Sequence, residues 1–231
     1  MPKSISAHDP RVTQNVQDYL KVIYGLTVSG GQASTSALAA RLGIAPASVT
    51  GMLQKLASRH PALVRYHKHQ GARLTPDGER AALEVIRHHR LLEAYLVDRL
   101  GFSGETVHAE ACRLEHVISE EFEARIDEQL GHPAIDPHGA PIPSSELVMP
   151  NLRRTPLSSL RPGDTAVVRQ VASMQAGLRL ELEELELFPG VRLAVIARDP
   201  ASGSLTLSTS RRPSFEVSAA ACEQLQVEQD A

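Results

Sequence analysis

The fold of the N-terminal part of this chain is decided by residues 36–56, SALAARLGIAPASVTGMLQKL. A first helix is predicted over residues 36–42, with Thr35 or Ser36 as its cap and Gly43 as its end. Pro46 suits the first turn of a second helix, whose inner face carries apolar residues at helical spacing: Val49, Met52, Leu53 and Leu56. Two short helices joined by a tight turn that contains glycine are typical of a helix-turn-helix motif.

The segments on either side extend this motif. A longer helix is predicted over residues 9–29, with Asp9 as its cap and Pro10 in its first position. Residues 62–74 predict a basic hairpin with a polar tip at 67–71. A basic hairpin directly after a helix-turn-helix indicates a wing, so we expect a winged helix-turn-helix.

The charge of the chain is unevenly distributed. Residues 1–75 hold nine Lys or Arg and two acidic residues, a net charge of +7, and the other 156 residues carry −10. A basic segment joined to an acidic one favours an N-terminal domain that binds a polyanion and a remaining part that has a different function. The alternative is a chance excess of basic residues on a solvated surface.

Further helices are predicted over residues 75–100, 104–117 and 119–130, and short strands over 165–171, 191–197, 204–209 and 215–218. Seven prolines between 132 and 163 indicate a stiff linker. The fold class is therefore mainly α with a small β part, and four segments are expected: a winged helix-turn-helix over 1–75, a helical dimerisation and metal-binding domain over 76–132, a Pro-rich linker over 133–163 and an SH3-like β domain over 164–231.

The sequence also favours some classes of protein over others. No apolar run approaches 18 residues, and the first 30 residues lack the features of a secretory signal, so we expect neither a membrane span nor export. Cys112 and Cys222 lie far apart, which fits a reducing cytoplasm better than a disulfide framework. Cys222 has no potential ligands nearby and is expected to be a small buried apolar residue.

The strongest chemical signal is the run from His108 through Cys112 to Glu115 and His116. Positions three and four apart share one face of a helix, so a thiolate, a carboxylate and two imidazoles would converge there. Such a set can hold a divalent transition metal. His89 and Glu93 repeat the four-residue spacing on the preceding helix, which allows a second site. The structural alternative is that each group is an ordinary packing or surface residue, but four such groups on one face would be costly to bury unpaired.

These features together resemble the diphtheria-toxin-repressor family of metal-dependent regulators, including its manganese-transport-regulator branch. The similarity covers nearly the whole chain, and the matching pieces are Asp18-Tyr-Leu-Lys-Val-Ile-Tyr24, Pro46-Ala-Ser-Val-Thr-Gly-Met-Leu-Gln-Lys-Leu56, Leu74-Thr-Pro-Asp-Gly78, His88-His-Arg-Leu-Leu-Glu93, the 108–116 run and Pro137-His-Gly-Ala-Pro-Ile-Pro143.

The resemblance implies two metal sites in each protomer. The implied primary site consists of Asp18, Cys112, Glu115 and His116, and the implied ancillary site consists of His89, Glu93 and His108, with Arg90 near it. Asp18 matches the manganese branch, whereas the toxin-repressor branch has methionine there; the manganese branch tends to have a carboxylate in place of Cys112. The family's β domain lends a Glu and a Gln to the ancillary site, where this chain has Gln170 and Ser173.

The predicted DNA-recognition helix is about 46–58. Small residues early in this helix permit close approach to the major groove, and polar and basic residues suit backbone contacts. The predicted DNA-binding residues of this helix are Ala47, Ser48, Thr50, Gly51, Gln54 and Lys55; Ser36, Arg65, Lys68 and Arg73 are predicted phosphate contacts. Plain solvent exposure is the alternative for each, above all for Lys68 and His69.

The sequence thus predicts a cytoplasmic, non-enzymatic transcription regulator, a repressor of metal homeostasis genes that binds double-stranded DNA as a homodimer on a palindromic operator. The expected cofactor is Mn²⁺ or Fe²⁺, with two ions per protomer. Two alternatives stay open: a metal-independent winged-helix repressor, and a metallohydrolase with Glu115 or Glu120 as base. The sequence contains no H-E-x-x-H motif, which counts against the hydrolase.

Overall fold

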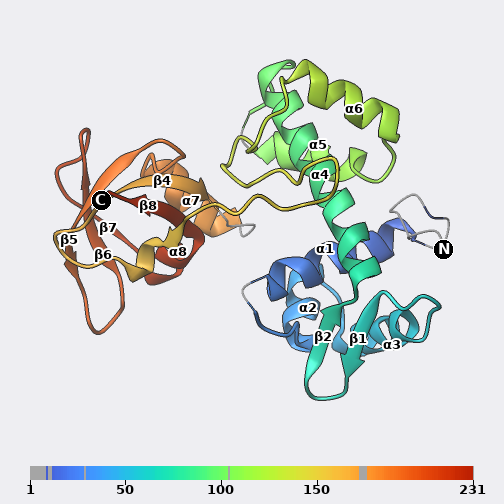
Figure 1. The fold of residues 1–231 in the computed structure, drawn as a ribbon. Helices are drawn as coiled ribbons and strands as arrows, with labels where there is room; N and C mark the ends of the chain where they lie inside the picture. Colours follow the sequence, from blue (N-terminus) through green and yellow to red (C-terminus); the bar gives the residue numbers. More distant parts are fainter. Residues whose placement is uncertain (1–8, 10–11, 29, 104, 172–175, 231) are drawn as a thin grey trace. The chain divides into compact units, whose positions relative to one another are not determined.

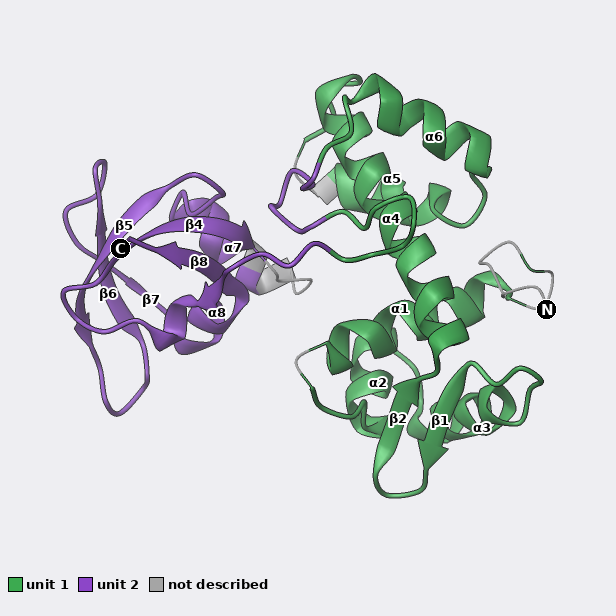
Figure 2. Cartoon of the chain, viewed as in Figure 1, with its two compact units in different colours: residues 1–133, 142–149 green, residues 134–141, 150–231 purple. Residues whose placement is uncertain are grey.

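The computed structural model describes the chain except residues 1–8, 10–11, 29, 104, 172–175 and 231 (Figure 1). The described chain divides into two compact units (Figure 2). The first unit comprises residues 1–133 and 142–149, and the second comprises residues 134–141 and 150–231.

The first unit begins with the predicted winged helix-turn-helix. Helices α1 (Gln14–Thr27), α2 (Thr35–Leu42) and α3 (Pro46–Ala57) are followed by the antiparallel strands β1 (Val64–His67) and β2 (Gly71–Leu74), which form the wing. Leu20, Ile23, Leu38, Leu53 and Leu56 are fully buried between these elements. The apolar positions at helical spacing therefore form the core that the sequence predicts.

Two helix starts differ from the prediction. Helix α1 begins at Gln14 with Thr13 as its N-cap, so Asp9 does not cap it, and Pro10 lies outside the described residues. Helix α2 is capped by Ser34, whose Oγ accepts a hydrogen bond from the Ala37 amide at 3.1 Å. Ser34 takes this role because its backbone is extended while Thr35 is already helical.

Three further helices complete the first unit: α4 (Pro76–Asp98), α5 (Glu105–Leu114) and α6 (Glu120–Gln129). Helix α4 starts beside the wing, where a Cβ on Gly78 would lie 1.9 Å from the Leu63 carbonyl oxygen, so only glycine fits. Helix α4 then packs against α1, α5 and α6. Helix α5 ends at Leu114, three residues before the predicted end, and residues 115–117 form a turn.

A buried ion-pair network joins α4 to α6. Arg87 Nε lies 2.7 Å from Glu123 Oε1, and Arg87 Nη2 lies 2.9 Å from Asp127 Oδ2. The remaining guanidinium nitrogen donates to the Pro143 carbonyl at 2.7 Å. His88 extends the network, because its Nε2 lies 2.8 Å from Glu123 Oε2. This network holds the helical part together from the inside.

The second unit is a small antiparallel sheet with two short helices. Its strands are β3 (Thr155–Pro156), β4 (Thr165–Val171), β5 (Arg192–Arg198), β6 (Leu205–Thr209), β7 (Phe215–Val217) and β8 (Leu225–Gln229), in the order β3-β8-β4-β5-β6-β7. Helices α7 (Ala176–Glu184) and α8 (Ala219–Gln224) and the 3₁₀ turn η1 (Leu157–Ser159) accompany them. The four predicted strands are present, and β3 and β8 are additional. Cys222 is fully buried in this core, as predicted, and burial raises the pKa of its thiol to about 11.

The segment predicted as a linker is more structured than expected. Residues 134–141 belong to the second unit, and residues 142–149 belong to the first. The Asp136 carboxylate accepts hydrogen bonds from the amides of His138 and Ala140, both at 2.8 Å, and Ile142 is buried in the core of the helical part. Apolar and hydrogen-bonding residues between the prolines therefore fix much of this segment.

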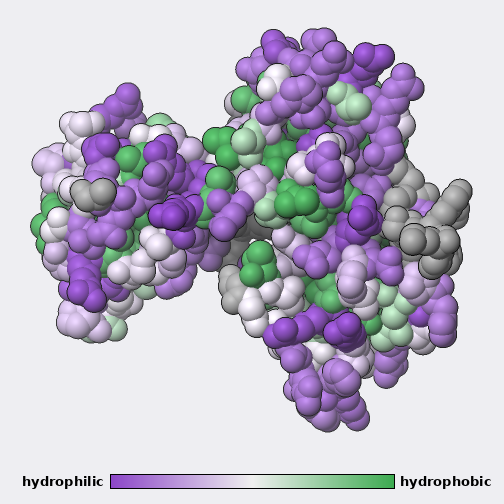
Figure 3. Space-filling view, viewed as in Figure 1, coloured by the Kyte–Doolittle hydropathy of each residue, from purple (hydrophilic) through white to green (hydrophobic). Residues whose placement is uncertain are grey.

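The wing has a hydrophilic surface (Figure 3). The wing lies at the bottom of the view in Figure 3, where hydrophilic residues predominate. Within the described chain, no single helix has the length and apolar character to cross a bilayer; the bent pair α2 and α3 meets that test only when its two helices are taken together, by length and composition alone.

Candidate metal centre and nucleic-acid interface

One group of potential ligands joins the winged helix-turn-helix to the helical part of the first unit. Asp18 comes from α1, whereas Glu115 and His116 lie in the turn after α5. His116 Nε2 lies 3.2 Å from Asp18 Oδ1 and 3.3 Å from Glu115 Oε1. One ligand atom from each residue lies within 4.8 Å of the others. Two carboxylates and an imidazole thus converge at one point.

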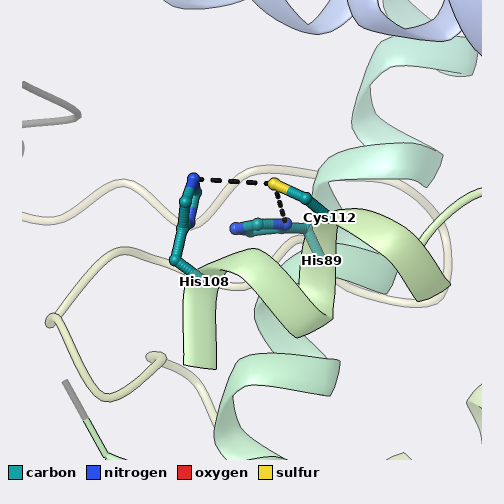
Figure 4. A group of neighbouring side chains, drawn as sticks. All are labelled: His89, His108 and Cys112. Carbon is teal, nitrogen blue, oxygen red and sulfur yellow. Dashed lines mark hydrogen bonds between the residues drawn. The ribbon is translucent and has the colours of Figure 1, made fainter. Parts of the chain in front are cut away.

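A second group lies between α4 and α5 (Figure 4). Cys112 Sγ is 3.5 Å from His108 Nε2 and 4.0 Å from His89 Nδ1. Glu93 Oε1 lies 3.0 Å from His89 Nε2 and 2.9 Å from His108 Nδ1. The ancillary residues implied by the family resemblance are therefore neighbours.

The structure places Cys112 with this second group, whereas the family resemblance puts it with Asp18. The reason is local. His108 and Cys112 stack one turn apart on α5, and the helix ends at Leu114, so Glu115 and His116 lie in the turn that meets α1. The two groups nevertheless adjoin, because Glu115 Oε2 lies 2.5 Å from His89 Nδ1.

The electrostatics of the second group are those of a charged cluster. Burial opposes ionisation of Cys112, but hydrogen bonds from His108 and His89 lower the pKa of its thiol to about 6. Hydrogen bonds with Cys112 and Glu93 raise the pKa of His108 to about 9. For His89, burial and the charge of Lys21 are outweighed by hydrogen bonds with Cys112, Glu115 and Glu93, which raise its pKa to about 10. Burial opposes ionisation of Glu115, but His89 and Lys21 hold the pKa of its carboxyl below the usual value.

This donor chemistry fits divalent transition metals. Thiolate and imidazole suit later first-row metals, and carboxylate suits Mn²⁺. Glu93 and Glu115 are nearly inaccessible to solvent, at 2% and 1%, and carboxylates are buried at this depth only when they are paired or bind a metal. Both groups therefore have ligand types and spacing suited to a cation.

Two further residues of this region, Gln17 and Lys21, contact the potential ligands and were not predicted from the sequence. The Nδ1 nitrogen of His116 donates to Gln17 Oε1, which leaves Nε2 facing Asp18 and Glu115. Such an outer contact sets which ring nitrogen is available as a ligand. Lys21 Nζ donates to both oxygens of Glu115, at 2.7 and 2.9 Å. Lys21 lies three residues after Asp18 and therefore on the same face of α1. This spacing is the feature of the sequence from which its proximity to the ligands could have been predicted.

A third group, Glu84, His88 and Glu120, also brings potential ligand atoms within 4.8 Å of one another. His88 Nδ1 donates to the Glu115 carbonyl at 3.0 Å, and His88 Nε2 faces Glu123 in the network around Arg87. We assign this group to the packing of α4 against α5 and α6.

In the second unit, Gln170 Oε1 accepts a hydrogen bond from Arg154 at 3.2 Å. Ser173 lies outside the described residues.

The candidate DNA-binding residues lie on α2, α3 and the wing. Most of them are exposed: Ser36, Ala47, Ser48, Gly51, Gln54, Lys55, Arg65, Lys68 and Arg73. Thr50 is partly buried, and its hydroxyl donates to the Pro46 carbonyl at 3.1 Å. Arg73 donates to the Gly30 carbonyl at 3.0 Å, which ties the wing to the segment before α2. The arrangement leaves one face of α3 open.

Models of protein families match three parts of the chain. The N-terminal DNA-binding domain of iron-dependent repressors matches residues 11–72, and their metal-binding and dimerisation domain matches residues 75–144. A FeoA domain, which corresponds to the small β domain, matches residues 155–229.

Individual proteins agree with these models. The iron-dependent repressor IdeR of Mycobacterium leprae is 38% identical over 125 residues, 54% of each chain, so the match spans about half the length of that relative. The diphtheria toxin repressor of Corynebacterium efficiens is 31% identical over 182 residues, 76% of this chain and 78% of that protein.

Solved structures are similar along most of the chain. A manganese-dependent transcriptional repressor in complex with manganese has a TM-score of 0.80 and 34% identity, over 93% of this chain and 99% of that one. The manganese regulator SloR has a TM-score of 0.82 and 28% identity, over 94% and 99%. The chain therefore belongs to the diphtheria-toxin-repressor family of metal-dependent regulators.

Proposed function

We propose that this protein is a metal-activated, DNA-binding transcriptional regulator of metal homeostasis genes. The observation that carries the proposal is the group of Asp18, Glu115 and His116, because α1 packs against α2 of the helix-turn-helix while the other two residues follow α5. A metal ion bound by these three residues would link the winged helix-turn-helix to the helical part. The family relationship and the charge of +7 over residues 1–75 support the same function.

The proposed cofactor is Mn²⁺ or Fe²⁺, with one ion for each of the two groups. A bound cation would offset the negative charge of the carboxylates and the thiolate. Asp18, Glu115 and His116 would hold one ion, and His89, His108, Cys112 and Glu93 would hold the other. Gln17 orients His116, and a metal favours the ordered arrangement only by its higher affinity for it.

The proposed working form is a homodimer on a palindromic operator. Four apolar side chains of the helical part are exposed and are candidates for contact with a second copy: Val97, Leu100, Val117 and Phe122, at 37, 56, 65 and 48% exposure. Two symmetric copies of α3 would read two half-sites, with Ala47, Ser48, Thr50 and Gly51 toward the groove and with Gln54 and Lys55 toward the DNA backbone. Ser36, Arg65, Lys68 and Arg73 would contact phosphates. A regulator of this kind acts on DNA in the cytoplasm.

The test begins with duplex DNA selected from a random pool by the protein in the presence of Mn²⁺. Binding of the selected duplex is then measured by fluorescence anisotropy with Mn²⁺, with Fe²⁺ under anaerobic conditions, and with a chelator. We expect strong binding with metal and weak binding with chelator. Equal binding under all conditions would favour a metal-independent repressor.

Glu115→Gln is the matched test of the metal centre, with Glu110→Gln as control. Glu110 lies on α5 and pairs with Arg113, away from the ligand groups. Glu115→Gln should abolish metal-stimulated binding while the protein stays dimeric in sedimentation, and Glu110→Gln should behave as wild type. Loss of the folded dimer in Glu115→Gln would indicate that Glu115 serves packing alone.

A further inference from the structure

A lysine lies inside the candidate metal centre. Lys21 Nζ lies 2.7 and 2.9 Å from the two oxygens of Glu115, and 3.3 Å from His89 Nδ1. The Glu115 side chain is 1% exposed and that of Lys21 is 17% exposed. An ammonium group on α1 therefore engages both oxygens of the carboxylate that adjoins both ligand groups.

The position of this ammonium conflicts with that of a bound metal. A carboxylate oxygen that binds a transition metal lies about 2 Å from it. Because Nζ is within hydrogen-bond distance of both Glu115 oxygens, a cation on either oxygen would lie less than about 5 Å from a like charge. At such distances in a poorly hydrated site, the repulsion between a divalent ion and an ammonium group is large.

We propose that Lys21 is an internal cation that competes with the metal for Glu115, and that it sets the metal concentration at which the protein becomes loaded. This inference rests on the proposed function of the same site. Lys21 can withdraw, because its stem is flexible and its side chain is already in partial contact with solvent. The free energy needed to move Lys21 away from Glu115 opposes the binding of every divalent ion alike. Lys21 therefore determines the metal concentration at which the protein is loaded, whereas the ligands determine which metal is preferred.

The position of Lys21 on α1 adds a structural consequence. Its pair with Glu115 connects the DNA-binding part to the turn after α5 by a contact that does not need a metal. Metal loading replaces this link with the one through Asp18, which lies one turn earlier on α1. The same helix thus carries both the competitor and a candidate ligand.

The experiment measures Co²⁺ binding by calorimetry, without DNA, for wild type, Lys21→Met, Lys21→Arg and Arg125→Met. Lys21→Met removes the charge and keeps the apolar stem; Arg125→Met is the control, because it removes a positive charge from the exposed surface of α6, where Arg125 pairs with Glu128. We expect Lys21→Met to bind at least about tenfold more tightly at the step that Glu115→Gln abolishes. Lys21→Arg keeps the charge and should not tighten binding, and Arg125→Met should equal wild type. Circular dichroism checks each fold, and Lys21→Gln replaces Lys21→Met if the latter does not fold.

The outcomes separate the two proposals. Suppose that wild type shows a Co²⁺-binding step that depends on Glu115, and that the folded Lys21→Met variant binds no more tightly at this step. This result overturns the competition by Lys21 and leaves the proposed function intact. Both proposals are overturned if the wild-type protein binds no Co²⁺, or if the Glu115→Gln variant binds Co²⁺ as well as wild type does. The visible absorption of Co²⁺ bound at the step that depends on Glu115 gives a second readout, and it should appear at lower Co²⁺ concentration in Lys21→Met.

Discussion

Metal binding to the group of His89, His108, Cys112 and Glu93 should release protons, and the number follows from the structure. The pKa values of His108 and His89 are raised to about 9 and about 10, so both rings are protonated at neutral pH. The pKa of Cys112 is lowered to about 6, so its thiol is already mostly a thiolate. A metal must therefore displace about two protons, both from imidazole rings.

The sign and size of the pH dependence follow. Below the raised pKa values, protons compete with the metal, so affinity rises as the pH rises toward about 9. Each proton released makes the apparent association constant rise about tenfold per pH unit, so two protons give about a hundredfold between roughly pH 6.5 and 7.5. His108→Asn removes a titrating ring and a proposed ligand, so Co²⁺ binding to this group should weaken, whereas the surface variant His132→Asn should keep the wild-type affinity and slope.

The assay is calorimetry with Co²⁺ at three pH values in buffers that differ in their heat of ionisation. The heat difference between buffers counts the protons released, independently of the affinity. His132→Asn is the matched control, because His132 lies on the surface beside Asp127 and away from the ligand groups. A count near zero at neutral pH, or an affinity that falls as the pH rises, would refute the protonated state deduced for His89 and His108.

Three other perturbations have defined outcomes. Arg87→Met should lower the free energy of unfolding by about 3–5 kcal/mol in urea titrations, because it leaves buried carboxylates unpaired, whereas the surface change Arg125→Met should cost less than about 1 kcal/mol; equal effects would contradict the buried network. Asp18→Met should shift activation away from Mn²⁺ toward Fe²⁺, Co²⁺ or Ni²⁺, since a thioether is a softer ligand than a carboxylate, and an unmoved Mn²⁺ curve in the anisotropy assay would mean that Asp18 is no ligand. Lys55→Ala or Arg65→Ala should weaken DNA binding and reduce the salt slope by about 0.9 for each lost phosphate contact; wild-type affinity and slope in both would place the DNA elsewhere.

Local patterns in the sequence determined much of the fold. The apolar spacing of residues 36–56 is enough for a helix-turn-helix, because the face that a helix buries depends only on positions three and four apart. The pairing of His89 with Glu93, and of His108 with Cys112, follows from the same spacing, and the structure has both pairs in contact or near contact. Strand β4 over 165–171 likewise follows from its alternating pattern.

Other features depended on the tertiary structure. The sequence places Cys112, Glu115 and His116 on one helical face, but α5 ends at Leu114, so the thiol meets His108 and His89 while the next residues meet Asp18. Strand β8 was missed because its partners β3 and β4 are distant in sequence, and pairing with them supplies its hydrogen bonds.

The role of Lys21 shows the same limit most clearly. The sequence alone shows Lys21 only as one of the nine Lys or Arg residues in the predicted DNA-binding domain. Only the packing of α1 against α4, and the turn after α5, bring its ammonium group onto Glu115, 94 residues away along the chain. Helical spacing determines which side chains share a face, whereas the charge that a face meets is decided by long-range packing, which no local pattern encodes.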